Sequence, residues 1–210
     1  MHDPAAWDRY WDNHFANQQT AGLAVMMAEM FSSVRDVARV MKAAGSTSIL
    51  CAGHGVSREA AALARAGLSV VALDLSPRAA EWCGRLVLDD ASLRRFLDPE
   101  QEAPGGHVEY VVGDLTNPSV CGGPFDLIIE RRTVQLFGEA RDQALEALGA
   151  RLAPRGVLLS HWHDGRWRPP SPRTHPNEQW FREHGWTILS GESAVGNREG
   201  RAAWLLFTTG

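Results

Sequence analysis

Short, almost entirely apolar runs alternate with longer amphipathic segments through the middle of the chain. We expect β-strands at the apolar runs, which are residues 48–52, 69–74, 108–112, 125–130 and 157–161. Helical periodicity separates several of them, at residues 58–66, 78–88 and 141–152. Apolar strands that alternate with helices predict a parallel sheet covered by helices on both faces.

The first 43 residues have a helical pattern in two parts. Trp7, Trp11 and Phe15 recur every four residues and give the first helix an aromatic face, and a second helix is expected over residues 23–42. The aromatic face is suited either to packing on the edge of the sheet or to forming a lid over a ligand. We therefore expect a helical segment at residues 1–45 on the substrate side and a main domain at residues 46–210.

The C-terminal pattern differs from the middle of the chain. Residues 186–190 and 202–207 read as strands, and the polar linker between them leaves no room for a helix. Strands joined in this way form an antiparallel hairpin. The fold class we expect is α/β, with one Rossmann-like sheet of seven mostly parallel strands, helices on both faces and a C-terminal antiparallel hairpin.

Composition narrows the possible partners. The 210 residues are 44% hydrophobic and 22% charged, which is typical of a soluble domain, and no apolar run approaches the length of a membrane span. The net charge of −4 disfavours nucleic-acid binding, and the N-terminus lacks the pattern of a signal peptide. The three scattered cysteines suggest neither disulfides nor a zinc knuckle. We expect a cytoplasmic protein, monomeric or homodimeric, that acts on a small molecule.

The turn after the first strand is rich in glycine. Gly53 and Gly55 suit a tight strand-to-helix turn that lets the backbone approach a ligand, and Ser57 is placed to cap the next helix. A dinucleotide fingerprint would have a third glycine at position 58, where Arg58 stands. A plain tight turn explains the two glycines equally well.

Two carboxylates follow the next two strands. Asp74 comes roughly 20 residues after Gly53, where an acidic residue can accept hydrogen bonds from ribose hydroxyls. The alternative is that Asp74 caps the next helix, although Ser76 can do so instead. Asp114 is suited to accept a hydrogen bond from an adenine amine while Leu115 packs on the ring. Because open α/β sheets bind ligands at the carboxyl ends of their strands, we expect these side chains to share one site.

The runs ILCAGHGVSREAAALARAGLSVVALDLSP, VEYVVGDL, FDLIIE and LAPRGVLLS resemble the successive motifs of the class I S-adenosylmethionine-dependent methyltransferases. The resemblance covers roughly residues 46–161, and the expected hairpin agrees with the reversed last strand of that family. WDRYW and GHGVSREAAALARAG are similar to the thiopurine-methyltransferase-like branch.

The resemblance implies methyl transfer from S-adenosyl-L-methionine, which leaves S-adenosyl-L-homocysteine. It implies a cofactor site made of Cys51, Gly53, Gly55, Asp74, Leu75, Asp114, Leu115 and Glu130. In that assignment the glycines line the methionine end and Glu130 borders the transferable methyl group. Cys51 stands where the family usually has an acidic residue, and a thiol does not supply an ionised carboxylate at neutral pH.

Candidate catalytic groups follow the fourth and fifth strands. A general base is needed only if the acceptor must lose a proton, and Glu130, His161 and His163 are the candidates. The two histidines share one face of a strand. With His175 they form a conceivable metal site, but locally bonded polar residues are the favoured interpretation, and we expect no metal.

Candidate acceptor-binding residues are aromatic or basic: Trp11, Arg131, Trp162 and Trp167. The Pro-rich stretch at residues 166–176 suits either a rigid pocket wall or a surface loop. Its arginines, with Arg131 and Arg132, are suited to bind a carboxylate on the acceptor, or they are ordinary surface charges.

Two alternatives to a small-molecule O-, N- or S-methyltransferase remain open. One is a cofactor-binding pseudoenzyme, which Cys51 supports. The other is a nicotinamide-dependent oxidoreductase, which Arg58 and the terminal hairpin oppose. Residues 129–132 read Ile-Glu-Arg-Arg and lack the signature of DNA amino methylators.

Overall fold

A computed structural model describes residues 3–16, 32–85, 99–163, 177–194 and 202–209. The chain divides into two compact units, an N-terminal unit of residues 2–121 and a C-terminal unit of residues 122–210. Each unit is described by itself. The division expected at residues 45 and 46 stays a prediction. Among the described residues no helix is both long and apolar enough to cross a membrane.

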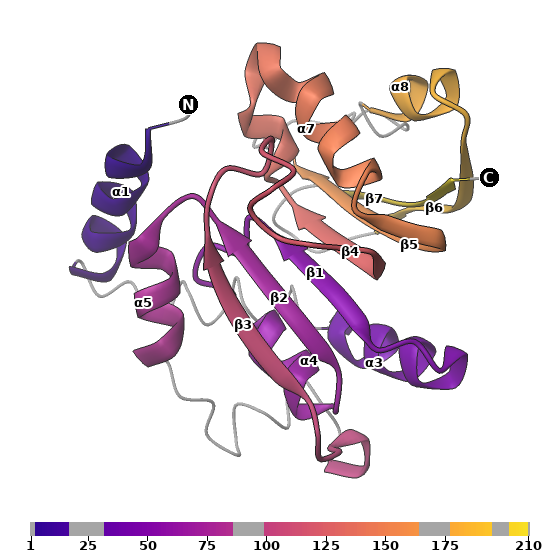
Figure 1. Cartoon of the computed structure of the whole chain (residues 1–210), viewed down its shortest axis with the longest axis horizontal. Coiled ribbons are helices and arrows are strands. Elements are labelled where there is room, and N and C mark those ends of the chain that lie inside the picture. The colour runs from indigo at the N-terminus through magenta and orange to yellow at the C-terminus, as the bar shows by residue number, and fades with distance from the viewer. Residues whose placement is uncertain (1–2, 17–31, 86–98, 164–176, 195–201, 210) are drawn as a thin grey trace. The chain divides into compact units, whose positions relative to one another are not determined.

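Where the structure describes it, the N-terminal unit combines three strands with helices. Its described elements are α1 (Pro4–Ala16), α3 (Ser32–Ala44), β1 (Ser48–Ala52), α4 (Glu59–Arg65), β2 (Ser69–Asp74), α5 (Pro77–Arg85), the short 3₁₀ helix η1 (Pro99–Gln101) and β3 (His107–Val112). Strand β2 pairs in parallel with β1 on one side and with β3 on the other. These strands run side by side in Figure 1. The parallel arrangement predicted for this part of the chain is confirmed.

The core of the N-terminal unit lies around β1 and β2. Ile49 and Leu50 of β1 and Leu73 of β2 have almost no exposed surface. Helix α4 contributes Leu63 and several small alanine side chains to this core, and the alanines let the helix approach the strands closely. Strand β3 instead alternates between more and less exposed positions, as expected of a strand with one solvated face. This buried core holds the carboxyl ends of β1 and β2 in place.

The described residues of the C-terminal unit form four strands. Its described elements are β4 (Phe125–Arg131), the 3₁₀ helices η2 (Val134–Leu136) and η3 (Gly138–Ala140), α7 (Arg141–Gly149), β5 (Leu152–His163), α8 (Glu178–Glu183), β6 (Trp186–Ala194) and β7 (Ala202–Thr209). Strands β4 and β5 pair in parallel, whereas β7 pairs antiparallel with both β5 and β6.

Some boundaries differ from the predicted ones. Strand β5 begins at Leu152 rather than at residue 157, because its pairing with β4 passes through an irregularity: Phe125 aligns with Leu152 but Leu127 with Val157. The residues of β5 between Leu152 and Val157 do not continue the apolar run, so the sequence pattern marked the strand only from residue 157 onward. Helix α8 was not predicted, because its six residues are too few for a periodic pattern. Parts of the helices expected at residues 23–42 and 78–88 lie outside the described residues.

Candidate functional site

The carboxyl ends of the three strands of the N-terminal unit are tied together by backbone hydrogen bonds. Gly53 donates its N–H to the carbonyl of Leu73 at 2.7 Å, which joins the turn after β1 to β2. Gly113 donates to the carbonyl of Asp74 at 2.8 Å, and Asp74 lies in register with Val112. The segments that carry Gly53, Asp74 and Asp114 therefore meet at one edge of the sheet, as expected.

The Asp74 carboxylate connects two of these segments. Its Oδ2 accepts the N–H of Gly55 at 2.8 Å, and its Oδ1 accepts the N–H of Ser76 at 2.9 Å. Gly53 and Gly55 have φ values of +67° and +52°, which favour glycine. Ser76 Oγ accepts the N–H of Ala79, so Ser76 caps α5 as predicted. Each oxygen of Asp74 has a second lone pair with which it can accept a ligand hydroxyl.

The Asp114 carboxylate shapes the turn that follows β3. Its Oδ1 accepts both the N–H and the hydroxyl of Thr116, each at 2.8 Å. This is the local side-chain-to-backbone pattern of an Asx-turn. Leu115 is buried in the same turn. Asp114 directly follows Gly113, which is bonded to Asp74, and the adenine contact expected of Asp114 stays a prediction.

Helix α1 lies beside α5 (Figure 1). It also contacts the turn after β1 that holds Gly53 and Gly55, here called the glycine turn. A Cβ atom on residue 55 would lie 2.8 Å from Cζ2 of Trp11, so the indole ring packs directly on the Gly55 backbone. Trp11 also stacks on Trp7 with ring centroids 6.4 Å apart. The aromatic face predicted for this helix is therefore present through Trp7 and Trp11, and one of its rings contacts the predicted cofactor loop. The side chain of Phe15 lies outside the described residues.

Two carboxylates attach α1 to α5, and sequence reasoning missed both. Asp8 Oδ1 accepts the Ser76 hydroxyl at 2.5 Å and the Arg78 N–H at 3.2 Å. Asp12 pairs with the Arg78 guanidinium at 3.4 Å and accepts from the Trp82 indole N–H at 3.4 Å. Their spacing of one helical turn places both on one face of α1. That spacing was the available signal, but nothing local in the sequence identifies the partners.

A cluster of buried polar groups that sequence reasoning also missed lies beside the glycine turn. His54 is 6% exposed, and its Nδ1 lies 3.7 Å from Sγ of Cys83. Its ring lies 5.3 Å from that of Tyr110 on β3. The Cys83 sulfur lies 3.5 Å from the carbonyl oxygens of Gly55 and Ser57, so α5 holds this turn through a thiol donor.

Burial governs the protonation of this cluster. It lowers the pKa of His54, an effect that the negative charge of Asp74 partly offsets. It raises the pKa of the Cys83 thiol to about 12, with the Asp74 charge acting in the same direction. It also raises the pKa of Tyr110. At neutral pH all three groups are therefore uncharged, and the cluster acts as a support of the turn rather than as a source of charge.

Cys51 and Leu75 were also expected at the cofactor. Cys51 is 4% exposed on β1 and belongs to the core of the N-terminal unit. Leu75 directly follows Asp74 and is partly exposed, so it is better placed to contact a ligand. The roles expected of both residues stay predictions.

Glu130 ends the buried part of β4 in the C-terminal unit. Its side chain is 1% exposed, its Oε1 accepts the Ser160 hydroxyl, and its Oε2 accepts the N–H groups of Thr133 and Val134 at 3.2 Å each. Burial raises its pKa, although these three hydrogen bonds act in the opposite direction. The carboxyl group therefore anchors the turn after β4.

Two other residues expected at the acceptor, Arg131 and Trp162, lie at the carboxyl ends of β4 and β5. Arg131 lies in register with His161 of β5, and Trp162 follows His161 along that strand. Both Arg131 and Trp162 are partly exposed. The side chain of His163 and all of Trp167 and His175 lie outside the described residues. Within the described part of the chain, no group of three or more potential metal ligands forms a site.

The sequence of residues 50–160 matches a family model described as "Methyltransferase domain", which spans more than half of the chain. The chain belongs to the methyltransferase-domain family. The resemblance found in the sequence is thereby confirmed at the level of the family. No curated protein matches this methyltransferase in the comparison of sequences.

Solved structures of methyltransferases share the fold. A TehB-like SAM-dependent methyltransferase from Corynebacterium glutamicum is 21% identical, with 99% of this chain and 100% of that chain covered and a TM-score of 0.62. Magnesium protoporphyrin IX methyltransferase from Synechocystis, with bound SAM, is 17% identical over 85% of this chain and 79% of that one, with a TM-score of 0.61. The glycopeptide N-methyltransferase MtfA with sinefungin is 14% identical over 84% and 86%, with a TM-score of 0.59. These similarities establish an α/β Rossmann-like methyltransferase fold.

Proposed function

We propose that this methyltransferase transfers a methyl group from S-adenosyl-L-methionine to an O, N or S atom of a small molecule in the cytoplasm and releases S-adenosyl-L-homocysteine. The main support is the Asp74 carboxylate, which is bonded to the Gly55 N–H beside the end of β3. The single seven-stranded sheet with its C-terminal hairpin, expected from the sequence, is part of this proposal. So is a monomeric or homodimeric state.

The residues of the N-terminal unit fit an adenosyl cofactor. Asp74 has a lone pair on each oxygen for a ribose hydroxyl. Gly53 and Gly55, whose positive φ values favour glycine, give the turn no side chains of their own. Leu75, Asp114 and Leu115 would hold the adenine. The methionine amino group needs an acceptor other than Cys51, whose thiol is buried.

Bound S-adenosyl-L-methionine would supply an electrophilic methyl group on a sulfonium. The protein then has to align the acceptor atom with that carbon and, for a protonated acceptor, to accept its proton. We assign the role of accepting this proton to His161 or His163 at the end of β5. Glu130 is 1% exposed and already accepts three hydrogen bonds from its own turn and from Ser160, so we assign this residue to positioning. Arg131, Trp11, Trp162 and Trp167 remain our candidates for contact with the acceptor.

We also propose that residues 1–45 form a lid over the cofactor. The contact of Trp11 with Gly55 and the attachment of α1 to α5 through Asp8 support this. Replacing Asp8 with alanine removes the acceptor for the Ser76 hydroxyl and the Arg78 N–H. It should weaken S-adenosylhomocysteine binding several-fold if α1 covers the cofactor. Unchanged affinity in a folded Asp8→Ala protein would contradict the lid.

Calorimetric titration with S-adenosylmethionine, S-adenosylhomocysteine and NADH tests the cofactor. We expect binding of the first two and none of NADH, whereas the opposite result would favour an oxidoreductase. Transfer of labelled methyl groups to phenols, amines and thiols tests turnover. Tight cofactor binding without transfer to any acceptor would favour the pseudoenzyme alternative, which the buried Cys51 in place of an acidic residue supports.

A further inference from the structure

The turn after β4 presents an arginine in a conformation that arginine rarely adopts. Arg132 directly follows the last residue of β4 and has φ +58°, in the left-handed region that favours glycine. Its N–H donates to the carbonyl of His161 at 2.8 Å, which fixes it at the carboxyl edge of β4 and β5. A backbone conformation of this kind in a non-glycine residue is a pointer to function.

The surroundings of Arg132 hold this conformation in place. The buried Glu130 carboxylate accepts the N–H groups of Thr133 and Val134, and so ties the end of β4 to the two residues that follow Arg132. The Ser160 hydroxyl donates to the same carboxylate from β5. The turn is therefore fixed from two strands, and glycine at this position would satisfy the same backbone with less strain.

The charge of Arg132 is available to a ligand. The residue is exposed, and no carboxylate among the described residues forms an ion pair with its guanidinium. Glu130 is the acidic residue next to it in the sequence, but its side chain is buried and already hydrogen-bonded. Leu136, the last residue of the 3₁₀ helix η2 that follows this turn, is 45% exposed and adds an apolar surface.

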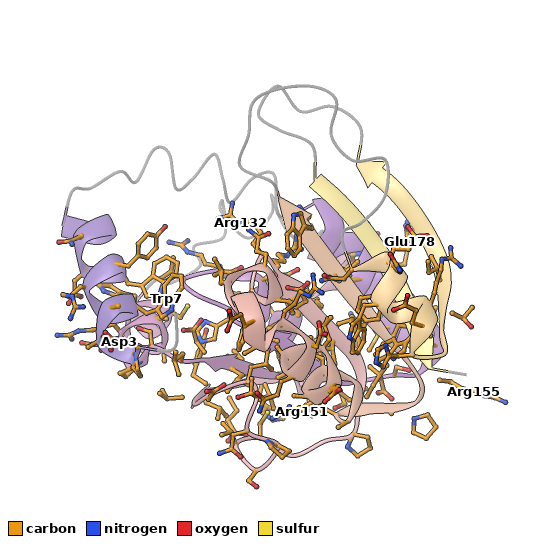
Figure 2. The ribbon with its side chains drawn as sticks, turned by 90° about the horizontal axis from the view of Figure 1, so that it is seen from above. Asp3, Trp7, Arg132, Arg151, Arg155 and Glu178 are labelled. Atoms are coloured by element: carbon orange, nitrogen blue, oxygen red, sulfur yellow. The ribbon has the colours of Figure 1, made fainter. Side chains whose placement is uncertain are left out.

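Arg155 provides the contrast within the same unit. It has φ +63° and is exposed, but it lies near the start of β5, in the irregular pairing with β4. Figure 2 shows Arg132 and Arg155 well apart. The backbone conformation of Arg155 belongs to that irregularity, whereas the pairing of β4 with β5 is regular from Leu127 to Arg131.

We infer that the Arg132 guanidinium binds a carboxylate on the acceptor, so that the substrate is a small molecule with an apolar body and a carboxylate group. Guanidinium and carboxylate pair through two parallel hydrogen bonds, which orient the ligand as well as attract it. The inference rests on the proposed function and names the class of its substrate.

Binding of matched probes to the full chain saturated with S-adenosylhomocysteine tests it. The probes are 4-hydroxybenzoate with phenol, 4-aminobenzoate with aniline, and 4-mercaptobenzoate with benzenethiol. Arg132→Gly keeps the turn and removes the charge, Arg132→Lys keeps the charge without the planar fork, and Arg155→Gly is the matched control. We expect Arg132→Gly to lower the affinity for at least one carboxylate probe about tenfold or more, and Arg132→Lys to lower that affinity less.

Arg132→Gly should not lower the affinity for the neutral probes or for S-adenosylhomocysteine, and it should not lower the urea midpoint of unfolding. The inference is overturned if the wild-type protein binds no carboxylate probe, if Arg132→Gly binds them all like the wild type, or if neutral probes lose affinity equally. The proposed function has separate readouts, namely S-adenosylhomocysteine binding and labelled methyl transfer to any acceptor. Transfer to the carboxylate acceptors that is insensitive to Arg132→Gly would refute the carboxylate assignment and leave the proposed function standing.

Discussion

The backbone N–H of Gly55 donates to the Asp74 carboxylate at 2.8 Å, so the turn after β1 is bonded to the end of β2 by the side chain expected to hold the ribose. The same carboxylate accepts the Ser76 N–H through its other oxygen. Asp74 therefore organises the turn and, in our proposal, binds the ligand. A change at this residue should affect stability and affinity together.

Replacing Asp74 with asparagine tests this double role. One carboxylate oxygen becomes an NH₂ group, which must then face an N–H donor and lose a hydrogen bond. We expect the free energy of unfolding to fall by roughly 1–3 kcal/mol. The affinity for S-adenosylhomocysteine should fall about tenfold or more, because a ribose hydroxyl loses a charged acceptor. Urea unfolding and calorimetry measure the two effects.

Asp142→Asn is the control for this experiment, because Asp142 is an exposed residue of α7. It removes an exposed ion pair with Arg141 and a charge in the first turn of α7, so it should lower the unfolding free energy by at most about 1 kcal/mol and leave the S-adenosylhomocysteine affinity unchanged. If Asp74→Asn were folded and bound S-adenosylhomocysteine as tightly as the wild type, the cofactor assignment of Asp74 would be wrong.

Gly55→Ala should destabilise the protein for two reasons. The φ of +52° is unfavourable for alanine, and the added Cβ would lie 2.8 Å from the Trp11 ring. Gly45→Ala is a matched control, since Gly45 has φ +68° but no atom within 4 Å of the added Cβ. We expect Gly45→Ala to cost about 1–2 kcal/mol from backbone strain alone, and Gly55→Ala to cost more.

A double-mutant cycle isolates the contact. In a Trp11→Ala background the extra cost of Gly55→Ala should shrink, with a coupling energy of about 0.5–3 kcal/mol in urea unfolding. Equal costs for the two glycine substitutions, with no coupling to Trp11, would mean that the indole does not rest on this turn in solution.

The sequence predicts that the Gly53 and Asp74 segments meet at one sheet edge, because the signals for this are local. Gly53 follows a buried strand directly, and Asp74 ends the next strand, so the order of the chain alone brings them to one edge of a parallel sheet. Ser76 as the cap of α5 follows from its position before Pro77 in the same way. In each case the residue and its structural context are neighbours in the sequence.

Contacts between distant segments could not be predicted in this way. The bond from Ser76 to Asp8 joins residues 68 positions apart, and that from Ser160 to Glu130 joins residues 30 apart. A carboxylate at a strand end reads as a catalytic candidate in the sequence. Only the packing of β5 against β4 reveals that Glu130 is buried and clamps a turn.

Glu130→Gln should alter the pH dependence of stability. Burial raises the pKa of Glu130 above its unfolded value, so the folded state retains this proton to a higher pH than the unfolded state. The residue therefore subtracts stability as pH rises through 4.5 and above. The difference in unfolding free energy, wild type minus Glu130→Gln, should decrease between pH 4 and pH 7.

Urea unfolding at several pH values gives this difference, and Glu146→Gln on the exposed face of α7 is the control. The control should show no such trend. A difference for Glu130→Gln that is constant with pH would contradict a raised pKa.

His54 should give the opposite trend. Burial lowers the pKa of its imidazole below the unfolded value near 6.5, so below that pH the unfolded state takes up a proton that the folded state resists. Stability is therefore lost as pH falls from about 7.5 to 5.5. His54→Asn keeps a polar group facing Cys83 but does not titrate, so it should lose less stability over this interval.

Exposed His107, at the start of β3, provides the control His107→Asn, which should follow the wild type. Urea unfolding at the two pH values measures the effect, and an equal loss in the wild type and His54→Asn would show that the glycine turn is supported without a neutral imidazole.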